Sequence, residues 1–291
     1  MTENNTTSDF ITYPKTFEKY KWYKPILVFI ISAIVYVILS VILTVAFGAI
    51  FGGNFTYSLV IGGYESMNTP IGHVFADLSV IIMIPSLYIG AKIVRDRPFS
   101  SYISSRGGWN YKLYLKAFII PFILTVIFEA IEIAIEGQDP NAVYHFSALL
   151  LIATIILVPL QCIAEEFVFR GFFMQTFGAW FNIPVVAIIL QSIIFTVIHG
   201  YNTIGLIEIF VSGLIYGFFA WKTNGIEVSS AMHTANNLSN AFFAMFGLAA
   251  ITSTVKTTDV VLGIIFNILL CIIMYYVGKK TDWFGEIPEN S

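Results

Sequence analysis

The chain has 291 residues, of which 57% are hydrophobic and 11% are charged, and its formal net charge is −3. Soluble domains carry about 25% charged residues, so most of this protein's surface faces something other than water. The composition excludes an ordinary soluble domain and predicts a membrane protein. The weakly acidic charge gives no support to nucleic acid as a partner. Cys162 and Cys271 lie in apolar runs, which predicts buried thiols and no disulfide framework.

Eight segments qualify as candidate membrane helices, because a hydrocarbon core of about 30 Å takes about 20 residues of helix. No repeat or linker divides the chain, so the predicted fold class is an all-α polytopic membrane protein. About eight transmembrane helices are expected in a single bundle with an internal polar cavity. The longest segment expected to be non-helical is 52–70, which contains glycines, Asn68 and Pro70. The eight segments are 25–50, 71–91, 115–135, 145–164, 184–200, 203–221, 226–246 and 258–278.

The predicted organisation is a polar N-terminal tail at 1–24, one transmembrane domain at 25–280 and a short C-terminal tail at 281–291. Cations gather in the tails and in two loops, and the opposite loops hold one, Lys256. Because lysine and arginine mark cytoplasmic loops, both termini are predicted to be cytoplasmic. The lysine-rich flanks and the lack of a eukaryotic sorting signal favour a bacterial plasma membrane. The gathered cations are Lys15, Lys19, Lys21, Lys24, Lys92, Arg95, Arg97, Arg106, Lys112, Lys116, Lys222, Lys279 and Lys280.

The first polar cluster is Glu165, Glu166 and Arg170, at the end of the fourth apolar segment. Ionisable groups inside membrane helices are costly and usually face the bundle interior. Glu166 and Arg170 are four residues apart on one helix face, whereas Glu165 is rotated from Glu166 by about 100°. The arginine is expected to hold Glu166 and to leave Glu165 free as a base. The alternative is that all three charges only mark a helix end.

The second cluster is "FTVIH", Phe195 to His199, and the third is "HTANN", His233 to Asn237. His233 and Asn237 are four residues apart and share a helix face. Asparagines in hydrocarbon need partners, so this helix is expected to face something polar. For His199 alone, a purely structural hydrogen bond is the alternative.

Two further pairs are interpreted as structural. His73 and His145 begin the second and fourth segments and are predicted to be interfacial. Gly213 and Gly217, four residues apart, predict close helix packing, and a contact within the bundle is favoured over a dimer interface.

A glutamate, two histidines and an asparagine make a set that can hydrolyse a bond. A carboxylate beside an imidazole deprotonates water, and a second imidazole and an amide can donate to an oxyanion. The same side chains could hold zinc, since Glu, His and His with an open fourth position is a catalytic zinc pattern. The His-Glu-x-x-His signature of zinc proteases is absent. Both possibilities therefore stay open: a site that requires no cofactor, or a zinc site.

In order along the chain, these motifs resemble those of the CPBP family, also called Abi. The family contains CAAX-type prenyl endopeptidases and bacteriocin-processing or self-immunity proteins. "EEFVFR" is similar to Glu-Glu-x-x-x-Arg, "FTVIH" to Phe-x-x-x-His and "HTANN" to His-x-x-x-Asn. The resemblance covers about residues 145–245. It implies an eight-helix bundle, a cavity open to the cytoplasm and intramembrane proteolysis.

The resemblance also implies roles for the motif residues. Glu165 would be the general base and His199 its partner on the water, and His233 and Asn237 would form the oxyanion site. The implied substrate is a membrane-associated peptide or protein, of the prenylated CAAX type or a bacteriocin or leader peptide. Members have been interpreted both as metal-dependent and as glutamate proteases without metal. The residues implied to support the site are Glu166, Arg170 and Phe195.

Two other functions are compatible with these residues. One is a non-catalytic self-immunity or binding protein of the same fold. The other is a small transporter that uses Glu165 and His199 as a proton relay, although no inverted repeat supports it. The sequence leaves the oligomeric state open.

If every helix crosses the membrane from one surface to the other, the three motifs lie at different depths. If the fifth helix began at the membrane surface near Pro184, His199 would lie about 22 Å away, too far from Glu165. Residues 167–183 are rich in aromatics and can lie within the bilayer. We therefore predict that the fourth helix extends well past residue 165 and that the fifth begins at a different level.

Overall fold

The computed structural model describes residues 9–281, without the side chains of residues 63–65. The predicted tails therefore lie partly outside the described residues, at 1–8 and 282–291. Within residues 9–281 every regular secondary-structure element is a helix, and the one strand-like pairing is a bridge between Ser104 and Gly225. The predicted all-α fold class is confirmed.

The helices fall into three groups along the chain. The first contains η1 (Tyr13–Thr16), α1 (Lys24–Phe51), α2 (Gly53–Gly62), η2 (Gly63–Asn68), α3 (Pro70–Ile81) and α4 (Met83–Val94). The second contains η3 (Phe99–Tyr102), α5 (Tyr111–Glu136), α6 (Ala148–Glu166), η4 (Phe167–Met174) and α7 (Gln175–Phe181). The third contains α8 (Pro184–Val197), α9 (Thr203–Lys222), α10 (Glu227–Met245) and α11 (Thr257–Thr281).

Each of the eight predicted segments is helical, but they are not equally suited to span a membrane. Six helices in residues 9–281 are long and apolar enough to cross one. α8 is apolar but shorter, and α10 is too polar to qualify. The chain is an integral membrane protein. The six qualifying helices are Lys24–Phe51, Pro70–Val94, Tyr111–Glu136, Ala148–Phe181, Thr203–Lys222 and Thr257–Thr281.

The prediction that residues 52–70 are non-helical is wrong. Gly52 has φ +94°, which ends α1 and turns the chain, a conformation that glycine adopts readily. After it, the run "GNFTYSLVIG" forms α2 and η2 follows. The glycines punctuate two helices here and do not mark a loop.

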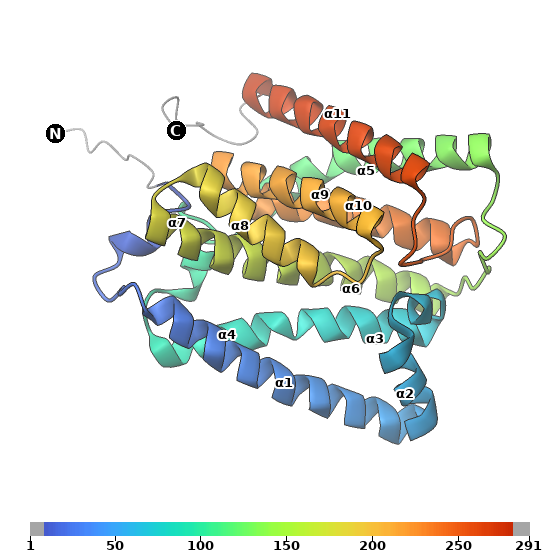
Figure 1. Ribbon diagram of the computed structural model, residues 1–291, viewed down its shortest axis with the longest axis horizontal. Coiled ribbons are helices and arrows are strands. Elements are labelled where there is room, and N and C mark those ends of the chain that lie inside the picture. Colours follow the sequence, from blue (N-terminus) through green and yellow to red (C-terminus); the bar gives the residue numbers. More distant parts are fainter. Residues whose placement is uncertain (1–8, 282–291) are drawn as a thin grey trace.

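The helices form three layers (Figure 1). α1 packs against α4 on one side, and α5 and α11 pack together on the opposite side. Between them lie α6 to α10, and α10 packs against α5, α6 and α9. α10 is enclosed in this way and most of its residues are buried. The described chain enters α1 and leaves α11 at the same end of the bundle.

The fourth predicted helix extends well past residue 165, as predicted. α6, η4 and α7 are one continuous helix, Ala148–Phe181, of 34 residues. A left-handed turn at Asn182, φ 58°, then leads directly into α8. Glu165 lies 16 residues before this helix ends, and His199 lies 15 residues after α8 begins. At 1.5 Å per residue, both are about 22–24 Å from the turn, which removes the conflict of depth.

A π-helical stretch, η4, directly follows the two adjacent glutamates. π-helical turns are rare and are frequent at functional sites. Gly171 lies in this stretch, where an added Cβ would collide with the backbone carbonyl oxygen of Tyr102. Phe167 stacks on Phe99 with ring centroids 5.2 Å apart. The loop 95–110 is therefore packed tightly on the wide turn that follows the glutamates.

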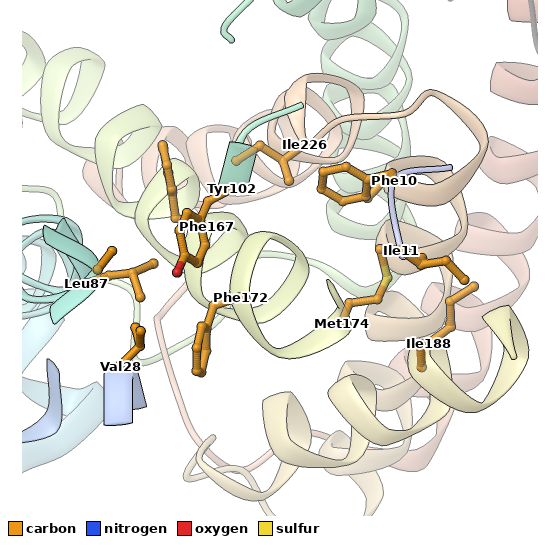
Figure 2. Close-up of a cluster of buried hydrophobic side chains, with 13 residues drawn as sticks. Phe10, Ile11, Val28, Leu87, Tyr102, Phe167, Phe172, Met174, Ile188 and Ile226 are labelled. Carbon is orange, nitrogen blue, oxygen red and sulfur yellow. The ribbon is translucent and has the colours of Figure 1, made fainter. Parts of the chain in front are cut away.

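The segment before α1 also packs on η4 (Figure 2). Phe10 and Ile11 are fully buried, in one cluster with Met174 of η4 and Ile226. An added Cβ on Gly178 of α7 would collide with the Ile11 carbonyl oxygen. Phe10 and Ile11, in the segment predicted to be a polar tail, thus belong to the core.

Candidate active site

The Glu166–Arg170 pair is the most deeply buried charged pair near the middle of the bundle. Arg170 Nη1 donates to Glu166 Oε1 at 2.8 Å, and both side chains are 0% exposed. Arg170 Nη2 also donates to the carbonyl of Gly213 at 3.2 Å. The guanidinium lies 4.5 Å from the ring centroid of Phe195 and 5.3 Å from that of Tyr216. Arg170 therefore joins η4 to α8 and α9, as well as holding Glu166.

The imidazole of His233 lies between the two adjacent glutamates. Its Nδ1 is 3.1 Å from Glu166 Oε1, and its Nε2 is 3.3 Å from Glu165 Oε2. Because Asn237 Nδ2 is a donor and lies next to His233 Nε2, Nε2 is assigned as the acceptor and Nδ1 as the nitrogen that donates to Glu166. Nε2 then faces Glu165.

Glu165 differs from Glu166 in what its carboxylate contacts. Glu166 accepts hydrogen bonds from Arg170 and His233. Glu165 Oε2 is buried and accepts no hydrogen bond from residues 9–281, although it lies close to His233. The Oε2 of Glu166 is also buried without a donor, so the two carboxylates differ in the hydrogen bonds that Glu166 accepts through Oε1. The contact between Arg170 and Glu166 is the one that their four-residue spacing predicts.

Asn237 connects α10 to α6. Its Nδ2 donates to Gln161 Oε1 at 3.1 Å and lies 3.3 Å from His233 Nε2. Gln161 is one turn before Glu165, on the same helix. The amide of Asn237 thus already has two acceptors, and it can donate to a reaction intermediate only by exchanging one of them.

His199 contacts the ring of Phe195, which also lies close to His233. It follows the end of α8, and its Nδ1 is 2.6 Å from the carbonyl oxygen of Phe195. The Phe195 ring is 4.5 Å from the His199 ring and 6.1 Å from the His233 ring, centroid to centroid. No hydrogen bond or ion pair joins His199 to Glu165 in the part of the chain that the structure describes. With a proton on Nδ1, the Nε2 of His199 is left as an acceptor.

Three polar side chains at this site are not among the residues predicted from the motifs. Tyr216 stacks on His233 with centroids 5.1 Å apart. Gln191 donates to the carbonyl of Gly213, which Arg170 also contacts. Gln161 holds Asn237. A signal existed for Gln161, because it precedes Glu165 by four residues, but Tyr216 and Gln191 belong to no motif.

The two structural interpretations have different outcomes. An added Cβ on Gly213 would meet Ser192, and one on Gly217 would meet Gln191, both on α8. Close packing within the molecule is therefore confirmed. His73, which was predicted to be interfacial, is 7% exposed, so its side chain is covered by protein. Its side chain turns inward to Asp77, one turn along α3, at 3.4 Å.

The donor set gives little support to a metal site in this conformation. Among residues 9–281, no group of three or more His, Cys, Asp or Glu side chains is arranged to hold a metal ion. Glu165 and His233 are adjacent, but among the described residues no hydrogen bond or ion pair joins His199 to either of them, and its ring contacts Phe195. A zinc site would need a third ligand to move, and we derive no step through a metal.

Comparison with known proteins supports the motif resemblance. A family model described as "Type II CAAX prenyl endopeptidase Rce1-like" matches residues 146–239. The chain carries an Rce1-like region. This region contains all three motifs, and the resemblance predicted from them is confirmed.

One curated relative is the "Uncharacterized protein YyaK" of Bacillus subtilis (strain 168). It is 30% identical over 177 residues, which cover 57% of this chain and 58% of that protein. The alignment thus spans little more than half the length of the curated relative. No solved structure matches the chain.

Proposed function

We propose that this protein is an intramembrane endopeptidase in which Glu165 activates water to hydrolyse a peptide bond. The observation that carries the proposal is the contrast inside the Rce1-like region. Both glutamates have a buried Oε2 without a donor, but Glu166 also accepts hydrogen bonds from Arg170 and His233 through Oε1. Among residues 9–281, Glu165 accepts no hydrogen bond, and its Oε2 lies 3.3 Å from His233 Nε2.

The reaction uses the side chains as follows. Glu165 takes a proton from water as the hydroxide adds to the peptide carbonyl carbon. His233 and Asn237 then lie next to the new oxyanion, and Asn237 donates to it by giving up a bond to Gln161 or His233. The proton on Glu165 passes to the leaving nitrogen as the C–N bond breaks. His199 Nε2 is an acceptor that can orient the water.

The proposed substrate is a membrane-associated peptide or protein of the prenylated CAAX type or a leader peptide. The enclosed position of α10 and the apolar outer helices favour a substrate that reaches the site from the membrane. We also propose that the protein lies in a bacterial plasma membrane with both termini in the cytoplasm. The support is that lysine and arginine are concentrated in the N-terminal segment, at the end of α11 and in the loops on the same side of the bundle.

A cleavage assay on purified full-length protein tests the proposal. The substrates are fluorogenic CAAX-type peptides and a panel of short hydrophobic peptides. Glu165→Gln should lower kcat by about 100-fold or more, because a lost general base typically costs that much. The matched control is Glu129→Gln, which changes a partly buried glutamate of α5 outside this group and should leave kcat unchanged.

A zinc chelator divides the two cofactor hypotheses. Cleavage that survives the chelator supports a carboxylate that acts without metal, as proposed here. Cleavage that is lost with chelator and restored by zinc would instead support a zinc enzyme. If folded wild-type protein cleaves none of the peptides, or if Glu165→Gln cleaves as fast as wild type, the proposal is wrong. The first of these results would favour the self-immunity or binding function.

A further inference from the structure

A cavity of about 660 Å³ lies outside the candidate active site, at the end of the bundle where α1 begins and α4 ends (Figure 1). Its wall is formed by residues 17–19 before α1, by the second half of α4 and by residues 95–99 after it. None of the motif residues lines it. The proposed hydrolysis therefore gives this cavity no role.

The wall of this cavity carries an excess of positive charge. Asp96 is 1% exposed, and its Oδ2 lies 3.7 Å from Arg97 Nε. Its Oδ1 accepts a hydrogen bond from Tyr102 at 3.5 Å, so the Asp96 carboxylate is already engaged with protein groups. A ligand in the cavity would therefore meet more positive than negative charge. The charged residues of the wall are Lys19, Lys92, Arg95 and Arg97, with Glu18 and Asp96.

Two of the cations have no partner of their own. Lys19 and Arg95 are exposed, and neither forms a hydrogen bond or an ion pair with the residues that the structure describes. Arg95 ends α4 in the left-handed region, with φ 53°. Glycine and asparagine adopt this conformation most readily, so the turn itself gives no reason for an arginine. Both charged groups are available to a ligand.

A third cation, Arg97, joins the cavity to the helix that carries the two adjacent glutamates. Its Nη1 donates to Gln175, and its Nη2 donates to the carbonyl of Gly171 at 3.4 Å. Arg97 is 8% exposed, and its buried Nε forms no hydrogen bond with residues 9–281. A buried donor without an acceptor is costly. An anion bound against Arg97 would supply both an opposite charge and an acceptor.

The surroundings of the cavity are those of a membrane surface. α4 is the last part of the candidate span Pro70–Val94. Trp22 and Tyr23, beside the start of α1, are 68% and 45% exposed, and such aromatics lie at the level of lipid headgroups. Ile93 of α4 is 60% exposed. The cavity therefore lies between a charged surface layer and the apolar sides of two membrane helices.

We propose that this cavity binds the phosphate group of an anionic membrane lipid, with Lys19 and Arg95 as its main ligands. Arginine matches phosphate through paired hydrogen bonds, and lysine supplies a point charge. Basic pockets beside membrane helices recognise anionic headgroups in this way. Phe17, Tyr88 and Phe99 of the wall suit the glycerol and the first methylenes of a lipid. A free phosphate ion offers the same charge but leaves these aromatic groups without a partner.

Native mass spectrometry of the purified full chain tests the proposal. The protein is titrated with phosphatidylglycerol and, separately, with neutral phosphatidylcholine that has the same acyl chains. Phosphatidylglycerol should bind more tightly. The variant Lys19→Gln with Arg95→Asn, in which asparagine suits the left-handed turn, should weaken the first phosphatidylglycerol by about tenfold or more and leave phosphatidylcholine unchanged.

The matched control is Lys279→Gln with Lys280→Gln. It removes the same charge at the end of α11, from exposed lysines outside the cavity, and should leave the affinity for phosphatidylglycerol unchanged. If the double variant of the cavity does not fold, Lys19→Gln alone should weaken the binding by about fivefold.

Hydrogen exchange in nanodiscs locates the lipid. Phosphatidylglycerol should slow amide exchange in residues 95–103 relative to phosphatidylcholine, and the cavity variant should abolish this protection. Inorganic phosphate at millimolar concentration, added to neutral nanodiscs, should give no protection. High salt should weaken the effect of phosphatidylglycerol, because it screens exposed charges.

Three results would overturn the lipid site. The first is equal affinity for the two lipids. The second is an equal loss of phosphatidylglycerol in the cavity variant and in the control variant, which would mean that only the overall charge of this surface matters. The third is protection by inorganic phosphate alone, which would make a free anion the ligand. None of these measurements uses a peptide substrate, so the lipid site and the endopeptidase are tested independently.

Discussion

α1 and α10 are helices of one bundle, and they contrast in almost every property. α1 is apolar along its whole length, and among its residues only Pro25, Val28 and Phe47 are buried. α10 contains serines, a histidine and three asparagines, and most of its residues are buried. Lipid is the surrounding medium for α1, whereas protein surrounds α10. Polarity in this protein therefore increases toward the inside, where protein groups and not lipid surround the polar side chains.

Small residues let the polar helix fit among its neighbours. Alanines and serines repeat along α10 and allow α5, α6 and α9 to approach its backbone closely. Tyr114 of α5 donates to Thr234 at 2.9 Å, and Gln161 of α6 accepts from Asn237. Close approach and hydrogen-bonded side chains therefore occur together at Thr234 and Asn237.

The largest effect is expected from breaking the buried ion pair beside α10. Arg170→Met should lower the free energy of unfolding by about 3–5 kcal/mol, because it leaves Glu166 buried without its arginine. Unfolding of the purified protein in mixed micelles measures this change.

The control for this prediction is the double variant Glu166→Gln with Arg170→Met. Because no charge is then left without a partner, it should be more stable than Arg170→Met alone. A double variant that is less stable than the single variant would show that the charges of the pair are not what matters.

A larger side chain should destabilise the protein when it is placed on α10, but not when it is placed on α1. Ala235 of α10 is 0% exposed, so Ala235→Leu should overpack the interior and cost about 1–3 kcal/mol. The matched control is Ala33→Leu in α1, where the alanine is exposed and the change should stay within about 0.5 kcal/mol. Equal losses in both variants, measured by the same unfolding titration, would contradict the enclosed position of α10.

Much of the architecture was predictable because it follows from hydropathy and from helical spacing. The apolar runs located the helices, and the four-residue spacing paired Glu166 with Arg170 and placed His233 next to Asn237. The depth conflict between Glu165 and His199 even predicted the long fourth helix. These features depend on local sequence, so they can be predicted from a single sequence.

The rest depended on contacts between distant segments. Asp77 stands 88 residues before Glu165, and nothing near either residue indicates that α3 packs on α6. The same holds for Tyr216, whose ring covers His233 from α9. The sequence of residues 53–68 resembles a glycine-rich loop. Glycine is common both at helix ends and in turns, so composition does not distinguish two short helices from a loop here.

The smallest effect is expected at the surface, where water replaces a lost partner. Lys256 donates to Glu136 at 3.2 Å, with side chains 73% and 38% exposed. Exposed pairs contribute little, since water and salt screen them, so Lys256→Gln should leave the thermal midpoint unchanged. The comparison is Arg106→Gln, which removes the partner of Glu227, a 0% exposed carboxylate at the start of α10. That variant should lower the midpoint, although the helix N-terminus offsets part of the loss. Equal midpoints for the two variants would mean that burial does not determine how much an ion pair stabilises this bundle.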